Sequence, residues 1–148
     1  MRLKSILCAV LLLSVTALFA ADPATISSPD GNLVFKVVSI PGSPGGLGYQ
    51  LSYKNREVIR TSRLGFVLKE PATPLDQFEI LAKETASVDE SWNPAWGEVK
   101  TIRNNYNQLT LKLKGQKDIL LTLVIRVFND GAGFRYVFPK RDGLNHFI

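Results

Sequence analysis

Both tryptophans of the chain lie in one short segment, residues 90–98, together with acidic residues and a proline. Aromatic rings can stack on the apolar faces of sugar rings, and a neighbouring carboxylate can accept hydrogen bonds from sugar hydroxyls. Trp92, Trp96 and Glu98 are therefore candidates for a carbohydrate-binding or domain-interface surface. The alternative is that the two tryptophans pack in a core or a rigid loop, because tryptophan buries a large apolar area.

Other residues that could perform catalysis are few and poorly spaced. His146 is the only histidine, and no carboxylates bracket it at the spacing that a metal site needs. A single histidine near the end of the chain also gives no convincing serine–histidine–aspartate set. Asp89 and Glu90 are adjacent, and adjacent residues on a strand point to opposite faces of the sheet. We therefore predict no catalytic residue and no metal-binding residue in this chain.

The composition is that of a globular protein with a single domain. Of the 148 residues, 45% are hydrophobic and 21% are charged, and the formal net charge is +5. This positive charge is mild and its basic residues are scattered along the chain. The sequence therefore predicts no nucleic-acid partner.

The N-terminus has the pattern of a secretory signal. Two basic residues precede an apolar stretch over residues 6–19, and Ala20-Ala21 provides small residues where a signal peptidase cuts. We predict a signal peptide over residues 1–21 and a single domain over residues 22–148, with no membrane contact after cleavage. The only cysteine, Cys8, leaves with the signal, so the domain has no disulfide. That is typical of the bacterial periplasm rather than of a disulfide-rich secreted scaffold, and we expect a periplasmic or secreted protein.

The second half of the chain shows a clear alternation of apolar and polar residues. This period of two predicts an antiparallel meander of three strands, separated by turns rich in glycine, aspartate and asparagine. The strands are expected over residues 109–113, 121–127 and 134–138. Leu120 and Val124 are apolar on the second side of the middle strand, so we expect this strand to be central and covered on both faces.

The first half is more irregular, although it also favours strands. Short β-rich runs predict strands at residues 33–39, 49–53, 58–59 and 64–68. Residues 71–83 are ambiguous, because a helix capped by Thr73 would place Leu75, Phe78 and Leu81 on one face, whereas a strand over residues 78–81 fits nearly as well. The fold class predicted from the whole pattern is all-β, an antiparallel β-sandwich.

Arg135 alternates with the aromatic residues of the last predicted strand. It should therefore point to the side opposite Phe134 and Tyr136. We expect it to pair with a carboxylate such as Asp130 rather than to touch a substrate.

Several motifs in order along the chain resemble the N-terminal domain of glycoside hydrolase family 97. The motifs lie at residues 27–32, 47–53, 92–98, 102–107 and 127–139. The resemblance covers residues 26–139, which is nearly all of the chain after the signal.

This resemblance implies an exported bacterial α-glucosidase or α-galactosidase. Family members have an N-terminal β-super-sandwich, a (β/α)8 barrel that carries the catalytic carboxylates, and a calcium ion to which the N-terminal domain lends a glutamate. In this chain that glutamate would fall after Ile148, and no barrel is present. The resemblance therefore implies an incomplete super-sandwich that is inactive alone and holds no calcium by itself. The partners implied are the missing barrel and, through the full-length enzyme, an α-glucoside or α-galactoside oligosaccharide.

Two functions remain open from the sequence. The first is a non-catalytic N-terminal domain that packs on the catalytic barrel of an exported α-glycosidase and helps to shape its carbohydrate site. The second is a stand-alone carbohydrate-binding or structural β-sandwich module.

Overall fold

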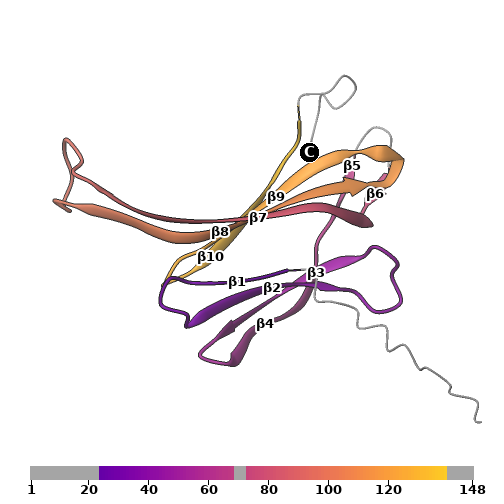
Figure 1. Ribbon diagram of the computed structural model, residues 1–148, viewed down its shortest axis with the longest axis horizontal. Helices are drawn as coiled ribbons and strands as arrows, with labels where there is room; N and C mark the ends of the chain where they lie inside the picture. Colours follow the sequence, from indigo (N-terminus) through magenta and orange to yellow (C-terminus); the bar gives the residue numbers. More distant parts are fainter. Residues whose placement is uncertain (1–23, 69–72, 140–148) are drawn as a thin grey trace, which may run out of the picture.

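The computed structural model describes residues 24–68 and 73–139. These residues form two four-stranded antiparallel sheets, a two-stranded sheet and a single turn of 3-10 helix (Figure 1). The all-β sandwich predicted from the sequence is therefore confirmed. The predicted signal peptide lies outside the described residues, as do both ends of the predicted domain. In the described part, no helix has the length and apolar character needed to span a membrane.

The first sheet is built by consecutive strands that each pair with the next. Its order is β1-β2-β3-β4, and its strands are β1 (Ala24–Ser27), β2 (Leu33–Ser39), β3 (Leu47–Tyr53) and β4 (Arg56–Arg63). Lys54 and Asn55 join β3 to β4, and both have positive φ angles, 48° and 62°. Two left-handed residues suit the tight turn of a twisted hairpin.

The second sheet has the order β10-β9-β8-β7. Its strands are β7 (Phe78–Trp92), β8 (Ile102–Gly115), β9 (Leu120–Val127) and β10 (Ala132–Val137), with the 3-10 turn Gln116–Asp118 between β8 and β9. A small sheet of β5 (Phe66–Leu68) and β6 (Thr73–Leu75) links the two large sheets along the chain. The predicted meander of β8, β9 and β10 is thus confirmed, and so is the central position of β9.

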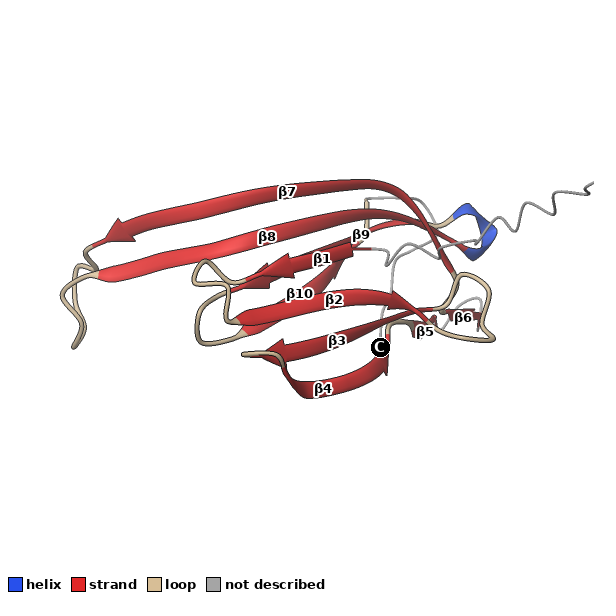
Figure 2. Cartoon of the chain, turned by 60° about the horizontal axis from the view of Figure 1, so that its bottom comes forward, coloured by secondary structure: helices blue, strands red, loops and turns tan. Residues whose placement is uncertain are grey.

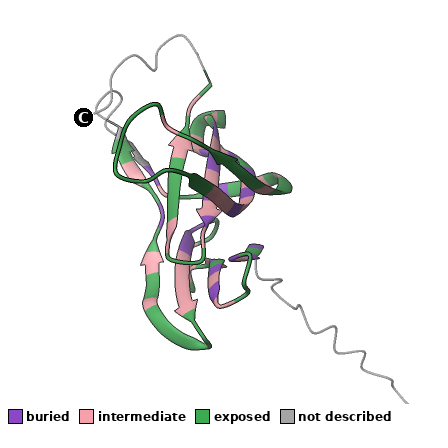
Figure 3. Cartoon of the chain, turned by 90° about the vertical axis from the view of Figure 1, so that its left-hand side faces the viewer, coloured by how far each residue is buried: buried purple, intermediate pink, exposed green. Residues whose placement is uncertain are grey.

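The hydrophobic core lies where the inner faces of the two large sheets meet. Every second residue of β9 is buried, and the core side chains of β8 follow the same period. Figure 3 shows buried residues in the middle of the molecule and exposed ones in the loops. The least exposed of the core side chains are Val37, Leu75, Leu111, Leu123, Ile125 and Val127.

Two expectations from the sequence are corrected by this arrangement. The helix considered over residues 71–83 is wrong, because β6 and β7 occupy this stretch as strands on either side of Asp76 and Gln77. The predicted cover on the second face of β9 is also wrong. Leu120 is 48% exposed, and Val124 is only partly buried.

Strands β7 and β8 are much longer than their neighbours. Strand β9 begins to pair with β8 only at Asn107, so residues 88–92 and 102–106 pair with each other and with no third strand. This two-stranded extension, which we call the arm, projects beyond the sandwich together with its loop, residues 93–101 (Figures 1 and 2). The arm carries both tryptophans to one end of the molecule.

Candidate functional site

The three residues singled out in the sequence all lie at the tip of the arm. Trp92 is the last residue of β7 and is 48% exposed, whereas Trp96 lies in the loop and is 88% exposed. Glu98 follows in the same loop and is also exposed. The structure therefore places the two tryptophans outside the core. Their role in binding remains a prediction.

The tip loop is held by local contacts rather than by packing on the body. The Thr101 hydroxyl donates a hydrogen bond of 2.8 Å to Asn93 Oδ1 across the base of the loop. Gly97 has a φ angle of 133°, a conformation that other residues rarely adopt, and a Cβ atom there would meet nothing within 4 Å. Glycine is thus needed for the backbone turn, while the space around it is open. The loop can present its side chains outward without support from the sandwich.

Polar pairs across the arm connect its two strands. Arg103 donates two hydrogen bonds to the carboxylate of Asp89, at 2.8 Å and 2.7 Å, and Asn104 donates one of 2.7 Å to Glu90. The adjacent carboxylates thus have different partners, as expected for side chains on opposite faces of the strand. The hydrogen bonds from Arg103 lower the pKa of Asp89 below its ordinary value. A carboxyl group held in its anionic form is a poor general acid, so Asp89 contributes to arm structure.

The arm is anchored to the first sheet at its root. The side chain of Asn107 donates a hydrogen bond of 2.9 Å to the backbone oxygen of Ser27 in β1, and it accepts one of 2.7 Å from Ser87 in β7. The backbone NH of Asp30 also donates to Asn129 Oδ1 at 3.1 Å, which ties the β1–β2 turn to the β9–β10 turn. The two contacts of Asn107 connect the root of the arm to the first sheet and to β7.

A second cluster, on β8 and β9, was not predicted from the sequence. The guanidinium of Arg126 lies over the ring of Tyr106, 4.5 Å from its centre, and that ring also contacts Phe128 at 5.1 Å between centroids. Arg126 also donates a hydrogen bond of 2.9 Å to Gln108. A sequence signal for this cluster did exist, because Tyr106 and Gln108 extend the polar side of the alternating β8 pattern towards the arm.

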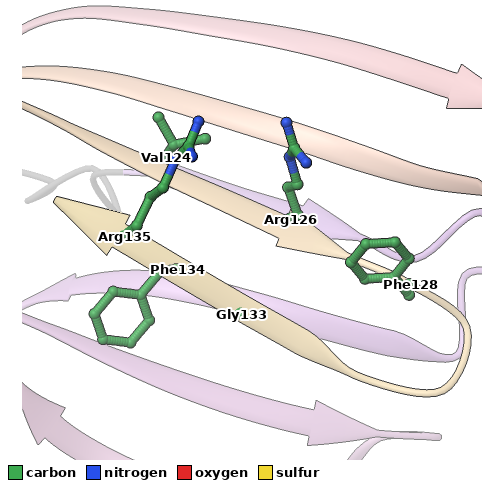
Figure 4. Close-up of a pocket in the computed structure, with 6 residues that line it drawn as sticks. All are labelled: Val124, Arg126, Phe128, Gly133, Phe134 and Arg135. Carbon is green, nitrogen blue, oxygen red and sulfur yellow. The ribbon is translucent and has the colours of Figure 1, made fainter. Parts of the chain in front are cut away.

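Arg135 behaves only partly as predicted. Figure 4 shows its side chain and that of Phe134 on opposite faces of β10, as the alternation indicated. The expected ion pair with Asp130 is wrong, because none joins these two described residues. Arg135 instead lines a hollow with Arg126 on the outer face of the sheet.

The described residues do not form a metal site. Within residues 24–68 and 73–139, no three side chains of histidine, cysteine, aspartate or glutamate are grouped so that they could hold an ion. The calcium ion implied by the family resemblance therefore has no fitting ligand set in this part of the chain.

Fold and arm together define an all-β sandwich domain that exposes aromatic residues at one end. A family model described as glycosyl-hydrolase 97 N-terminal matches residues 26–148. The chain belongs to this family.

Relatives with known names are much longer than this chain. The retaining α-galactosidase of Bacteroides thetaiotaomicron is 29% identical over 125 residues, which are 84% of this chain and 18% of the relative. A probable retaining α-galactosidase of Streptomyces bingchenggensis is 27% identical over 123 residues, again 18% of its length. The chain thus spans about one fifth of the curated relatives that it matches.

Solved structures agree with this assignment. A glycoside hydrolase family 97 enzyme of Pseudoalteromonas sp. strain K8, solved in complex with acarbose, matches with a TM-score of 0.72 and 35% identity over 82% of this chain and 18% of that chain. A variant of the same enzyme was solved with panose and matches with a TM-score of 0.71. A β-arabinopyranosidase matches with a TM-score of 0.70 at 20% identity over 82% of this chain and 19% of that chain, which shows the fold alone.

Proposed function

We propose that this chain is the N-terminal, non-catalytic domain of an exported α-glycosidase. In this role it packs on the catalytic barrel of the full-length protein and helps to shape the carbohydrate site. The observation that carries the proposal is the family match, which takes in most of this chain but only about one fifth of the relatives named as glycosidases. An α-galactoside or α-glucoside is the substrate class, reached through the full-length enzyme, and calcium would be bound there with help from the other domains.

The N-terminal sequence supports a place of action outside the cytoplasm. Residues 1–21 would direct the protein to the periplasm or the exterior of a bacterial cell, where its signal is removed. Oligosaccharides are available in these compartments, so export is consistent with glycoside hydrolysis. A domain without cysteine would also fold there without depending on disulfide formation.

The arm is the part of the domain that fits a role near a carbohydrate. Trp96 and Trp92 present exposed rings at the end of a projection, with Glu98 in the same loop. On a neighbouring barrel, such a projection can reach the rim of the substrate site, where rings stack on sugars and the carboxylate accepts hydroxyl protons.

A chimaeric enzyme tests the proposal. In the Bacteroides α-galactosidase, the segment that matches this chain is replaced by the corresponding residues of this chain, and α-galactoside hydrolysis is measured. We expect the folded chimaera to hydrolyse the substrate, and we expect this chain alone to release no sugar from α-galactosides or α-glucosides. Hydrolysis by the chain alone would overturn the proposal. So would a folded chimaera no more active than the same enzyme without its N-terminal segment.

A second candidate function is a stand-alone module that binds carbohydrate. It is favoured by the closed core, since the two large sheets already bury their inner faces against each other. Thermal unfolding of the chain with and without maltooligosaccharides distinguishes the two functions. A sharp transition that sugar moves to higher temperature would support the module, whereas a transition unaffected by sugar supports a domain that needs its barrel.

A further inference from the structure

The outer face of the second sheet is unusual for a surface that meets water. By strand register, this outer face consists of Gln108, Thr110 and Lys112 on β8, Leu120, Thr122, Val124 and Arg126 on β9, and Gly133, Arg135 and Val137 on β10. Apolar side chains are prominent at the end of this face away from the arm, where Leu81 is 51% exposed, Leu120 48% and Val137 41%. They line a hollow of about 360 Å³. A group of exposed apolar side chains on one sheet face is typical of an interaction surface.

A second hollow on the same face, of about 320 Å³, contains two guanidinium groups (Figure 4). Arg126 is held in place by the ring of Tyr106 and by the acceptor oxygen of Gln108. Arg135 rises from the next strand on the same side of the sheet. Gly133, two residues before Arg135 on β10, pairs with Arg126, and an added Cβ atom there would meet nothing within 4 Å. The result is an open notch with a positively charged rim.

The carboxylates of this sheet do not neutralise the notch. Glu84 is bound to Lys112 at 2.6 Å, Asp89 to Arg103 at 2.7 Å, and no ion pair among the described residues includes Arg126 or Arg135. Two planar guanidinium groups that line one hollow suit a carboxylate, which can accept hydrogen bonds from both. The charge of the notch therefore complements an acidic group that comes from outside the described residues.

We propose that this outer face docks the part of the full-length protein that lies outside the matched segment, with a carboxylate of that part seated between Arg126 and Arg135. This proposal rests on the proposed function and identifies the surface through which it operates. The apolar lining supplies the buried area, and the carboxylate sets the register of the two domains.

Two other occupants fit the face less well. A second copy of this chain, docked through the same face, would bring Arg126 and Arg135 against the same positive groups, and like charges across an interface are unfavourable. A sugar has hydroxyl groups on every side and needs several polar partners, whereas Val124 and Phe128 form much of the notch. A protein surface that combines apolar side chains with one carboxylate matches both properties.

The same face continues onto the arm. Trp92 and Ile102 are directly opposite each other in the strand pair. Ile102 is six residues before Gln108 on β8, an even number, so the two side chains lie on the same side of the strand. Successive alternate residues of a strand lie on one side of a sheet, so Trp92 is on the side of the two arginines. A domain seated on the outer face would therefore lie alongside the arm and beneath its tip.

Thiol labelling measures whether the face is covered. In a Cys8→Ser background, Thr122→Cys reports on the outer face, and Val34→Cys, on the outward side of β2 and also partly buried, is the matched control. Each is made in this chain and in the Bacteroides chimaera. We expect Thr122→Cys to react about tenfold more slowly in the chimaera, the ratio given by a docked fraction of about nine-tenths. Val34→Cys should react equally in both.

Charge reversal tests the carboxylate. Arg135→Glu should lower the midpoint of thermal unfolding of the chimaera but leave that of the isolated chain unchanged, while Arg63→Glu on exposed strand β4 should change neither. Equal labelling of Thr122→Cys in both proteins would overturn the proposal. An Arg135→Glu effect of the same size in chain and chimaera, or no effect in either, would also overturn it. So would failure of the chimaera to fold when the isolated chain folds.

These outcomes separate the docking surface from the proposed function. If the chimaera is active but Thr122→Cys is not protected from labelling, the proposed function stands and the proposed docking surface is wrong. If Thr122→Cys is protected in the chimaera but the chimaera is inactive, the proposed docking surface stands and the proposed function is wrong.

Discussion

The two ends of the β7–β8 strand pair differ in how far their large apolar side chains are buried. At the body end, Leu109, Leu111 and Leu113 are at most 2% exposed and pack between two sheets. At the arm end, Trp92 and Ile102 are 48% and 38% exposed and face no second layer. The body residues are thus explained by burial, whereas the large apolar residues of the arm are not. The contact proposed above, with a part of the protein outside this domain, would account for them.

The two ends also differ in what keeps them ordered. A two-stranded hairpin without a third strand is marginally stable by itself. The arm continues two strands that are already fixed in a four-stranded sheet, and it adds cross-strand pairs such as Arg103 with Asp89. Its order therefore depends on its root, while the body depends on its core. Four substitutions or titrations test this contrast, beginning with the largest expected effect.

A core substitution should destabilise the whole body. Leu111 is fully buried, and replacing a buried leucine with alanine leaves a cavity and removes apolar contacts. We expect Leu111→Ala to lower the free energy of unfolding by about 2–5 kcal/mol, measured by denaturant titration. Its neighbour Thr110, on the outer face, is the matched control, and Thr110→Ala should cost much less. Equal costs would show that the inner face of β8 is not the core.

A substitution at the root should affect the arm more than the body. Asn107→Ala removes the hydrogen bonds to Ser27 and from Ser87, at a cost of about 1–3 kcal/mol if their partners remain partly buried. Hydrogen exchange should accelerate at the amides of the arm before those of β9. Asn105→Ala, one residue pair further along the same side, is the control and should leave exchange at the root unchanged. Acceleration spread evenly over the chain would contradict the idea of a local anchor.

The contrast between body and arm also decides how much the sequence could predict. The strands of the body were found because Leu109, Leu121 and their alternate neighbours must be buried, and burial leaves a period of two. Residues 71–83 were ambiguous, because Leu75, Phe78 and Leu81 have the spacing of one helical face, whereas residues 78–81 also fit a short strand. Only tertiary pairing of β7 with β8 resolves them.

The arm and the candidate site were harder to predict for the same physical reason. Residues 84–91 are mostly polar, so no apolar alternation marks them as strand, and their pairing with β8 continues a register set in the body. The unusual composition of residues 90–98 did identify the tip. It could not reveal that Trp96 is exposed, or that Arg126 and Arg135 share a face, because both facts depend on which strands become neighbours.

At the tip, a large side chain should contribute almost nothing to the stability of the domain. Trp96 is 88% exposed, so Trp96→Ala should change the free energy of unfolding of the isolated chain by less than about 0.5 kcal/mol. In the Bacteroides chimaera the same substitution should change either the KM for the α-galactoside or the thermal stability. A higher KM at unchanged thermal stability indicates a sugar contact, and lower thermal stability at unchanged KM indicates a domain contact.

A conservative variant sharpens the experiment on Trp96. Trp96→Phe keeps an aromatic ring and should retain most of the wild-type behaviour of the chimaera. If Trp96→Ala alters neither KM nor thermal stability of the chimaera, the tip has no role in this enzyme. The exposed side chains of the arm would then have no demonstrated contact, and the difference between body and arm would be structural only.

The smallest expected effect is a titration confined to the arm. The hydrogen bonds from Arg103 lower the pKa of Asp89, whereas the pKa of Asp30, at the β1–β2 turn, is lowered mainly by the Ser28 hydroxyl. Because the folded pKa of Asp89 is depressed, the stabilising effect of its pairing is complete above the unfolded value of about 3.9 and is lost as the pH falls through the folded pKa. Arg103→Gln should return the pKa of Asp89 towards the unfolded value.

Carboxyl carbon shifts followed by NMR through an acid titration measure both groups in one sample. In Arg103→Gln the Asp89 curve should move to higher pH while the Asp30 curve stays in place, because Asp30 keeps its bonds from Ser28 and Asn32. The midpoint of thermal unfolding at neutral pH should hardly change, since exposed ion pairs contribute little. A large loss of stability, or a shift of Asp30 together with Asp89, would mean that the arm and body form one cooperative unit rather than two differently constructed parts.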